Sequence, residues 1–138
     1  MVRMFVIAAF AWSATTALAA DKVDFAKDVW PILHDKCVSC HRAPYKKGTR
    51  VKKPKGDLRI DTKELFLKGG EDGKVVVPGK PDDSTIYTLT LLDEDHDDVM
   101  PPKGDLLTDK EKATLKNWIL QGADFGTWTE GKYVEKEK

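Results

Sequence analysis

The residues best suited to chemistry are two cysteines and a histidine that lie close together, Cys37, Cys40 and His41. On a helical turn, residues three apart project from the same side of the backbone. Two thiols spaced in this way can add to the two vinyl groups on one edge of a haem, and the adjacent histidine can then ligate the iron. The pattern therefore predicts one covalent haem c, with His41 as an axial ligand of its iron.

Three other roles for these cysteines are weaker. A disulfide between residues three apart would close a very small loop and constrain little of the unfolded chain. A thioredoxin-like dithiol belongs in a βαβ pattern, which the neighbouring sequence lacks. A zinc site needs four ligands, and although His34 or His96 could join, two ligands adjacent in sequence suit tetrahedral geometry poorly. Haem attachment is the favoured interpretation.

Residues 1–19 have the features of an export signal. A positive start at Arg3 is followed by the apolar run Met4–Trp12 and by Ala17-Leu18-Ala19, a small-x-small pattern that signal peptidases read. We expect cleavage after Ala19, with Ala20 as the alternative, and a periplasmic mature protein. An uncleaved anchor is less favoured, because a spanning helix needs ~20 apolar residues.

Met100 is the candidate for the second axial ligand. It is the only methionine left after the expected cleavage, and two prolines follow it. Prolines restrict the backbone on both sides, so the loop can hold a thioether at the iron against competing water. A methionine that only fills a gap in the core is the alternative. His96 lies among carboxylates and His34 lies one turn before Cys37, so both are weaker ligand candidates.

Helices are expected to position these residues. Asp24 can cap a first helix that leads directly into the cysteines and kinks or restarts at Pro31. Another helix is expected after Asp83 or Ser84. The capping box Thr108-Asp109-Lys110-Glu111 predicts the start of the last helix, and a glycine at position 122 suits its end.

The remaining segments are expected to be irregular. Residues 42–57 are rich in Lys, Gly and Pro, which predicts an exposed loop. A short β-hairpin is expected around the turn at residues 69–73. We divide the chain into a signal peptide at residues 1–19, one domain at residues 20–128, and a charged tail at residues 129–138 that is expected to fray.

The overall charge is balanced, with 23 basic and 23 acidic residues, and removal of Arg3 leaves 22 against 23. No global field favours nucleic acid or an anionic membrane. Basic residues gather at residues 46–55 and acidic residues at 93–98. Either stretch could steer a partner or be a solvated loop. If the loop before Met100 borders the haem edge, a basic partner is favoured.

The sequence resembles the c-type cytochromes, and more narrowly the cytochrome c domain first catalogued in planctomycetes. The stretches that carry the resemblance are FAKDVWPILHDKCVSCH, KGDLRIDT, LKGGEDGKVVVPGKPDDSTIY, VMPPKGDLLT and LKNWILQGADF. The resemblance implies an all-α fold around one haem, with His41 proximal and Met100 distal. It also implies that the first and last helices pack together, which would place Phe25 and Val29 near Trp118.

A haem iron with histidine and methionine ligands has no open coordination site, so we expect an electron carrier rather than an enzyme. The expected partners are redox proteins, and the protein is expected to be a monomer that does not need a membrane. Arg59 could pair with a haem propionate or be a solvated surface residue. The carbonyl of Pro44 could accept a hydrogen bond from His41. Two alternatives stay open: a haem subunit of a larger oxidoreductase, and a sensor or enzyme with a displaceable distal ligand.

Overall fold

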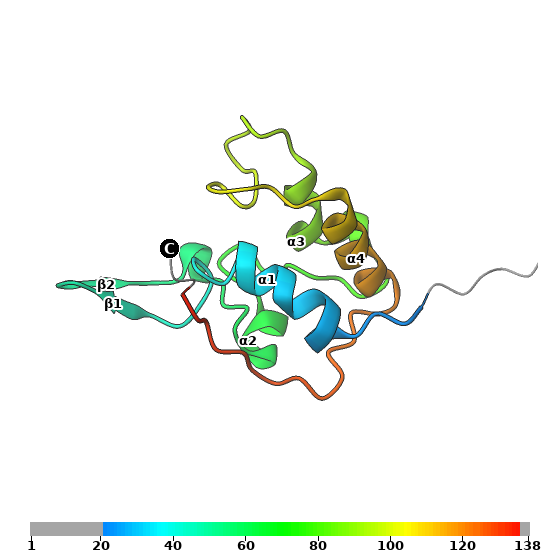
Figure 1. Ribbon diagram of the computed structural model, residues 1–138, viewed down its shortest axis with the longest axis horizontal. Coiled ribbons are helices and arrows are strands. Elements are labelled where there is room, and N and C mark those ends of the chain that lie inside the picture. The colour runs from blue at the N-terminus through cyan, green and yellow to red at the C-terminus, as the bar shows by residue number, and fades with distance from the viewer. Residues whose placement is uncertain (1–20, 136–138) are drawn as a thin grey trace, which may run out of the picture.

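The computed structural model describes residues 21–135, so the expected signal peptide lies outside the described residues. The fold is small, mainly helical and includes a two-stranded antiparallel sheet, so it is mixed rather than purely all-α (Figure 1). In chain order the elements are a π-helical turn Phe25–Val29, α1 Trp30–Lys36, β1 Tyr45–Lys47, β2 Arg50–Lys52, a 3₁₀ turn Lys55–Asp57, α2 Lys63–Lys68, a 3₁₀ turn Pro81–Asp83, α3 Thr85–Thr88, a 3₁₀ turn Leu89–Leu91, and α4 Asp109–Leu120. No helix in the described range is long and apolar enough to cross a membrane.

The first helix forms as the sequence predicts. The Asp24 side chain accepts a hydrogen bond from the Lys27 amide at 3.0 Å, which caps the first turn. Pro31 falls in the first turn of α1, where its missing N–H costs least. The change from π-helical to α-helical backbone occurs just before it, which is the restart that the proline predicts.

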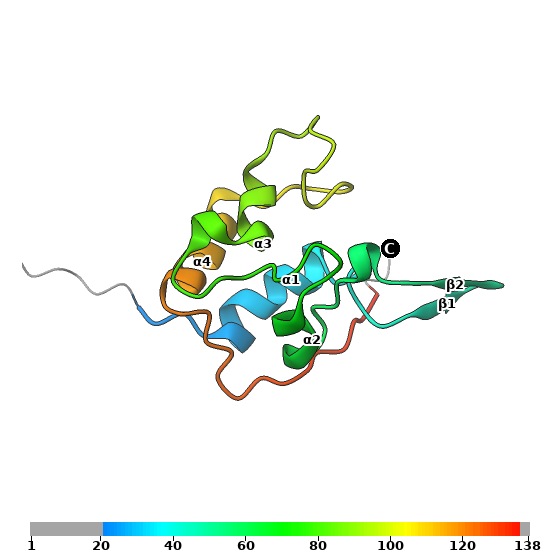
Figure 2. The same ribbon diagram turned by 180° about the vertical axis from the view of Figure 1, so that it is seen from behind.

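An aromatic cluster joins the first helix to the last, as the resemblance implies. Phe25 is 2% exposed, and its ring lies 5.2 Å from that of Trp118 and 4.6 Å from that of Phe125. The Phe66 ring of α2 lies 6.4 Å away from Phe25, so three helices meet at one side chain. Figures 1 and 2 show α1 lying between α2 and α4. Val29 is fully buried in the same core.

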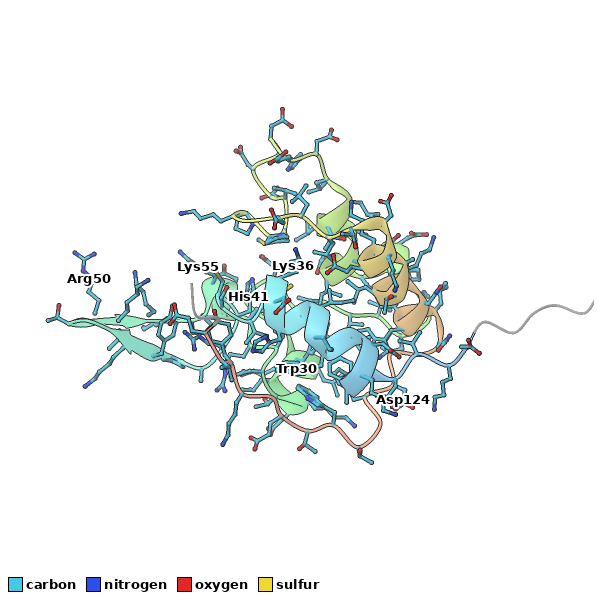
Figure 3. All side chains as sticks on the ribbon, viewed as in Figure 1. Trp30, Lys36, His41, Arg50, Lys55 and Asp124 are labelled. Atoms are coloured by element: carbon cyan, nitrogen blue, oxygen red, sulfur yellow. The ribbon has the colours of Figure 1, made fainter. Side chains whose placement is uncertain are left out.

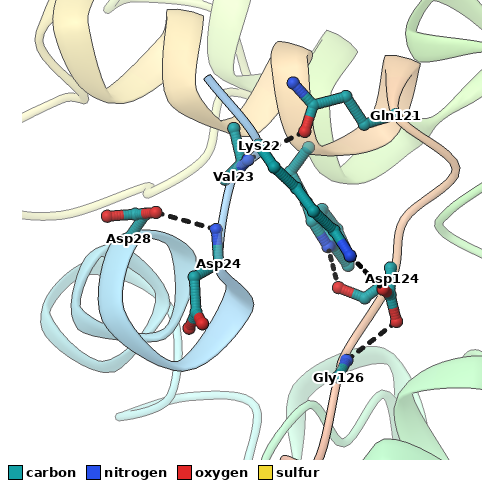
Figure 4. Close-up of polar contacts among 8 residues, drawn as sticks. Lys22, Val23, Asp24, Asp28, Gln121, Asp124 and Gly126 are labelled. Atoms are coloured by element: carbon teal, nitrogen blue, oxygen red, sulfur yellow. Dashed lines mark hydrogen bonds and ion pairs between the residues drawn. The ribbon is translucent and has the colours of Figure 1, made fainter.

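Helix α4 has the expected ends. Thr108 and Glu111 form the complete capping box, and the Thr108 amide donates to the Glu111 carboxylate at 2.7 Å. After the helix, Gly122 has φ +100°, a conformation that favours glycine. The Val23 amide donates to Gln121 Oε1 at 2.8 Å, so the start of the described chain is held against the end of α4 (Figure 4).

The hairpin does not lie where the sequence predicts it. The turn at residues 69–73 exists, but it is flanked by α2 on one side and carries only the single bridge Gly70–Gly73. The paired strands are β1 and β2, inside the segment expected to be a loop, with Lys46 opposite Val51 in their register. Their side chains are mostly exposed, and backbone pairing, which residue composition does not reveal, makes the ladder.

The segment after Trp128 is hydrogen-bonded to the rest of the fold, although most of its side chains from 129 to 135 are exposed. The Lys63 amide donates to the Thr129 carbonyl at 2.7 Å, and the Gly131 amide donates to the Asp61 carbonyl at 2.9 Å. A side chain at Gly131 would overlap the Trp30 ring, so glycine permits this close approach. Backbone pairing and aromatic packing, rather than charge, hold this segment against α1 and α2.

Candidate functional site

The Cys37–His41 segment forms a tight turn at the end of α1. The Cys37 amide donates to the Leu33 carbonyl at 2.8 Å, and the Cys40 and His41 amides both donate to the Cys37 carbonyl at 3.1 Å. The turn is anchored by Val38, which is fully buried. Cys37 and Cys40 form no disulfide; Cys37 is half-buried and Cys40 is exposed. The backbone is therefore fixed while both thiols remain free to react.

The segment at residues 55–60 braces this turn from outside. The Lys55 amide donates to the Cys40 carbonyl at 3.0 Å, and the Ile60 amide donates to the His41 carbonyl at 3.0 Å. Figure 3 shows Lys36, His41 and Lys55 gathered at the C-terminal end of α1. These bonds connect two parts of the chain that residue spacing alone did not link.

The His41 ring is poised as a neutral ligand. Burial lowers its pKa below 6.5, because desolvation disfavours the imidazolium; the backbone of Leu58 and Lys55 opposes this shift more weakly. Nδ1 is buried and has no hydrogen-bond partner of good geometry within the described residues. The expected bond to the Pro44 carbonyl is therefore not formed. Neutral imidazole is the form that binds a metal.

Burial favours the protonated form of the Cys37 thiol. Burial, with a smaller contribution from the neighbouring Cys40, raises its pKa from 9.0 to about 12. Lys36 opposes this shift, and Glu111 at the start of α4 adds a still smaller contribution that raises the pKa. A thiol kept in this form is slow to be oxidised or to bind a stray metal.

The loop that carries Met100 is tied to the same end of α1. The Met100 amide donates to the Leu89 carbonyl at 3.1 Å, and Val99 beside it is buried. Five residues further on, the Asp105 carbonyl accepts a hydrogen bond from Lys36 Nζ at 3.2 Å. Lys36 immediately precedes Cys37. This hydrogen bond links the end of α1 to the loop that carries Met100, whose side chain is half-buried.

Two arginines near the site have partners that the sequence did not reveal. Arg59 makes a two-pronged ion pair with Asp61, with both N–O distances at 3.0 Å. Arg42 lies between two aromatic rings, 3.7 Å from the centroid of Tyr45 and 4.1 Å from that of Tyr133. The short spacing between Arg42 and Tyr45 could have suggested their contact. No sequence signal near Arg42 predicts its contact with Tyr133.

Trp30 and Trp118 both pack against other aromatic side chains. Trp30 packs against Trp128, with ring centroids 5.0 Å apart, on the side covered by the C-terminal segment. Trp118 is buried in the Phe25 cluster, and its indole N–H donates to the Asp124 carbonyl at 2.8 Å. Among residues 21–135, no three His, Cys, Asp or Glu side chains converge so that they alone could hold a metal ion.

Comparison with known families identifies this arrangement. Residues 37–104 match a family model described as planctomycete cytochrome C. This chain contains a cytochrome c-type domain. The match begins at Cys37 and ends just after Met100, so the proposed attachment turn and distal loop both lie within it. No curated protein and no solved structure matches the chain.

The cytochrome match implies haem-based electron transfer, with haem c and iron as cofactors. The residues of this chain fit that cofactor. Two thiols that form no disulfide lie on one rigid turn, and the next residue is a half-buried histidine whose buried Nδ1 has no hydrogen-bond partner in the described part of the chain. Soft sulfur and imidazole ligands are those that haem proteins use.

Proposed function

We propose that this protein carries single electrons between redox proteins outside the cytoplasm, through one haem c bound covalently to Cys37 and Cys40. His41 and Met100 are the proposed axial ligands. The observation that supports this most directly is the hydrogen bond from Lys36 to the Asp105 carbonyl, because it joins the attachment turn to the loop that bears Met100. A bound haem would supply a one-electron couple that cycles with little rearrangement.

The chain's own residues would hold the ligands and exclude water. The hydrogen bonds to the Cys40 and His41 carbonyls fix the backbone of the turn that carries the imidazole. Pro101 and Pro102 stiffen the distal loop, and the Met100 amide is anchored to Leu89. With both axial positions filled from rigid segments, a substrate has no open position. This favours a carrier over an enzyme.

We further propose that the mature protein is a periplasmic monomer without bound nucleic acid or a required membrane. The near-balanced charge supports this. The export signal proposed at residues 1–19 would deliver the thiols to the compartment where haem is attached.

The first test is co-expression with a haem-attachment system, followed by denaturing electrophoresis, haem staining and intact mass. The wild type should retain one haem after denaturation, and a Cys37→Ser/Cys40→Ser variant should retain none. Serine is the matched control because it keeps size and polarity but cannot form a thioether. The reduced wild type should bind carbon monoxide slowly. Rapid binding would favour a sensor or enzyme, and absence of covalent haem would refute the proposal.

A further inference from the structure

We propose that the basic hairpin, residues 45–55, is the docking site for an acidic surface on the protein that exchanges electrons with the haem. This inference rests on the proposed function, since it needs a haem beside the hairpin. It names the chemistry of the partner, which the family match does not.

The basic hairpin has an unusual concentration of charge. Its basic side chains are all exposed and are Lys46, Lys47, Arg50, Lys52, Lys53 and Lys55. No acidic residue lies between Pro44 and Asp57. None of the ion pairs found in the described part of the chain includes one of these six side chains. The positive charge is therefore available to a partner.

The protein gains little stability from this arrangement. Two strands of three residues make a marginal ladder, and their side chains are largely exposed. Lys47 lies directly opposite Arg50 in the register, which places like charges face to face. Such pairs destabilise a hairpin. A role in folding therefore does not explain this charged, projecting element, whereas a role in binding does.

The position of the basic hairpin connects it to the haem site. Its first strand follows Arg42, whose guanidinium lies 3.7 Å from the Tyr45 ring centroid. Its C-terminal residue, Lys55, is bonded to the attachment turn, because the Lys55 amide donates to the Cys40 carbonyl. Figure 3 shows Arg50 at the tip and Lys55 at the base near His41. Cys40 is the exposed cysteine, so a haem bound there would be held next to the base of the hairpin.

Two other partners fit less well. The acidic stretch at residues 93–98 is also exposed, and a basic partner there is the alternative that the sequence leaves open. However, none of its backbone hydrogen bonds within the described residues reaches the attachment turn. An anionic lipid surface would attract the same charge. However, Val51 is the only large apolar side chain of the basic hairpin that is fully exposed, at 60%, which gives little area to bury in a membrane.

The test uses reduced holoprotein and the trianion hexacyanoferrate(III) as an acidic redox probe. The variant Lys46→Gln/Arg50→Gln/Lys52→Gln removes three charges from the hairpin. At an ionic strength of about 10 mM, its rate constant for oxidation should fall about tenfold or more. The difference should shrink to about threefold or less near 0.5 M salt.

The matched control is Lys27→Gln/Lys68→Gln/Lys116→Gln. It removes the same charge from exposed helical positions outside the hairpin. Its rate constant should fall by no more than about threefold. In a second measurement, a decaglutamate peptide added to isotope-labelled holoprotein should shift the amide resonances of residues 45–55 together with those of Cys40 and His41.

Equal slowing in the two triple variants, or no slowing in the hairpin variant, would overturn the proposal while leaving the electron carrier intact. Co-sedimentation of the wild type with phosphatidylglycerol vesicles at about 150 mM salt would also overturn it, because lipid would then be the partner. A protein without reducible haem would give no reaction with the probe. That result would contradict the proposed function itself.

Discussion

Phe25 is the side chain whose loss should most damage the framework around the site. It is 2% exposed and its ring lies within 6.4 Å of the rings of Phe66, Trp118, Phe125 and Trp128. Truncating such a residue to alanine removes the transfer free energy of the ring and leaves a cavity, which together cost about 4 kcal/mol. That figure includes the attraction between the Phe25 ring and its aromatic neighbours.

This loss is a large share of the stability of a small domain, which is about 5–15 kcal/mol. An unfolding entropy of ~2.1 cal/mol/K per residue over residues 21–135 gives roughly 0.24 kcal/mol/K. A loss of about 4 kcal/mol should therefore lower Tm by about 17 °C. The assay is urea and thermal unfolding of the holoprotein, followed by far-ultraviolet circular dichroism. Phe25→Leu should cost only about 1–1.5 kcal/mol because it keeps most of the apolar volume.

Val51→Ala is the surface control, because Val51 is 60% exposed and its truncation should change the unfolding free energy by less than about 0.5 kcal/mol. A loss below about 1 kcal/mol for Phe25→Ala, or a loss equal to that of the control, would refute the packing argument. In that case the first helix would not depend on the aromatic cluster for its position beside α4.

Three further predictions concern the contacts around this framework. A double-mutant cycle on Arg42→Leu and Tyr133→Leu should give a coupling free energy of about 1 kcal/mol in urea unfolding, and zero coupling would mean that the stack contributes nothing. Ser84→Ala should lower the unfolding free energy by about 1–3 kcal/mol. The buried hydroxyl donates to the Lys80 carbonyl at 2.8 Å and accepts from the Val77 amide at 2.9 Å. An unchanged unfolding free energy would contradict this role of the hydroxyl. The pKa of the exposed Asp124 carboxyl lies below 3.8, chiefly because it accepts a hydrogen bond from the Gly126 amide (Figure 4). Its contribution to stability is therefore present above about pH 4 and lost as the pH falls below it, so urea midpoints of Asp124→Asn should show a shallower acid decline than the wild type.

Local signals predicted part of this fold well. The capping box at Thr108, the glycine after α4 and the restart at Pro31 depend on bonds within a few residues, so the sequence reveals them. Helix α2 was missed although Thr62 caps it and Gly69 ends it, because its single turn and a half carries too short an apolar pattern. Ser84 precedes α3 as expected, but its hydroxyl bonds the preceding loop instead of the helix.

Contacts between distant segments could not be predicted in the same way. The lysine-rich stretch looked like a loop because residue composition does not reveal backbone pairing, yet it forms β1 and β2. The residues after Trp128 looked like a fraying tail because they are charged, yet Tyr133 stacks on Arg42. Cys37, Cys40 and His41 were evident from spacing, whereas the bond that ties Lys36 to the distal loop needed the fold.

The measurement that tests the central claim most directly is the ferric absorption spectrum of the holoprotein and of its Met100→Ala variant. Methionine ligation of ferric haem gives a weak far-red band, which should be present in the wild type and absent from the variant. The reduction potential should also fall in the variant, since the thioether favours ferrous iron. A His96→Ala variant should keep the band. A covalent haem that lacks the band in the wild type, or that keeps it without Met100, would contradict the account.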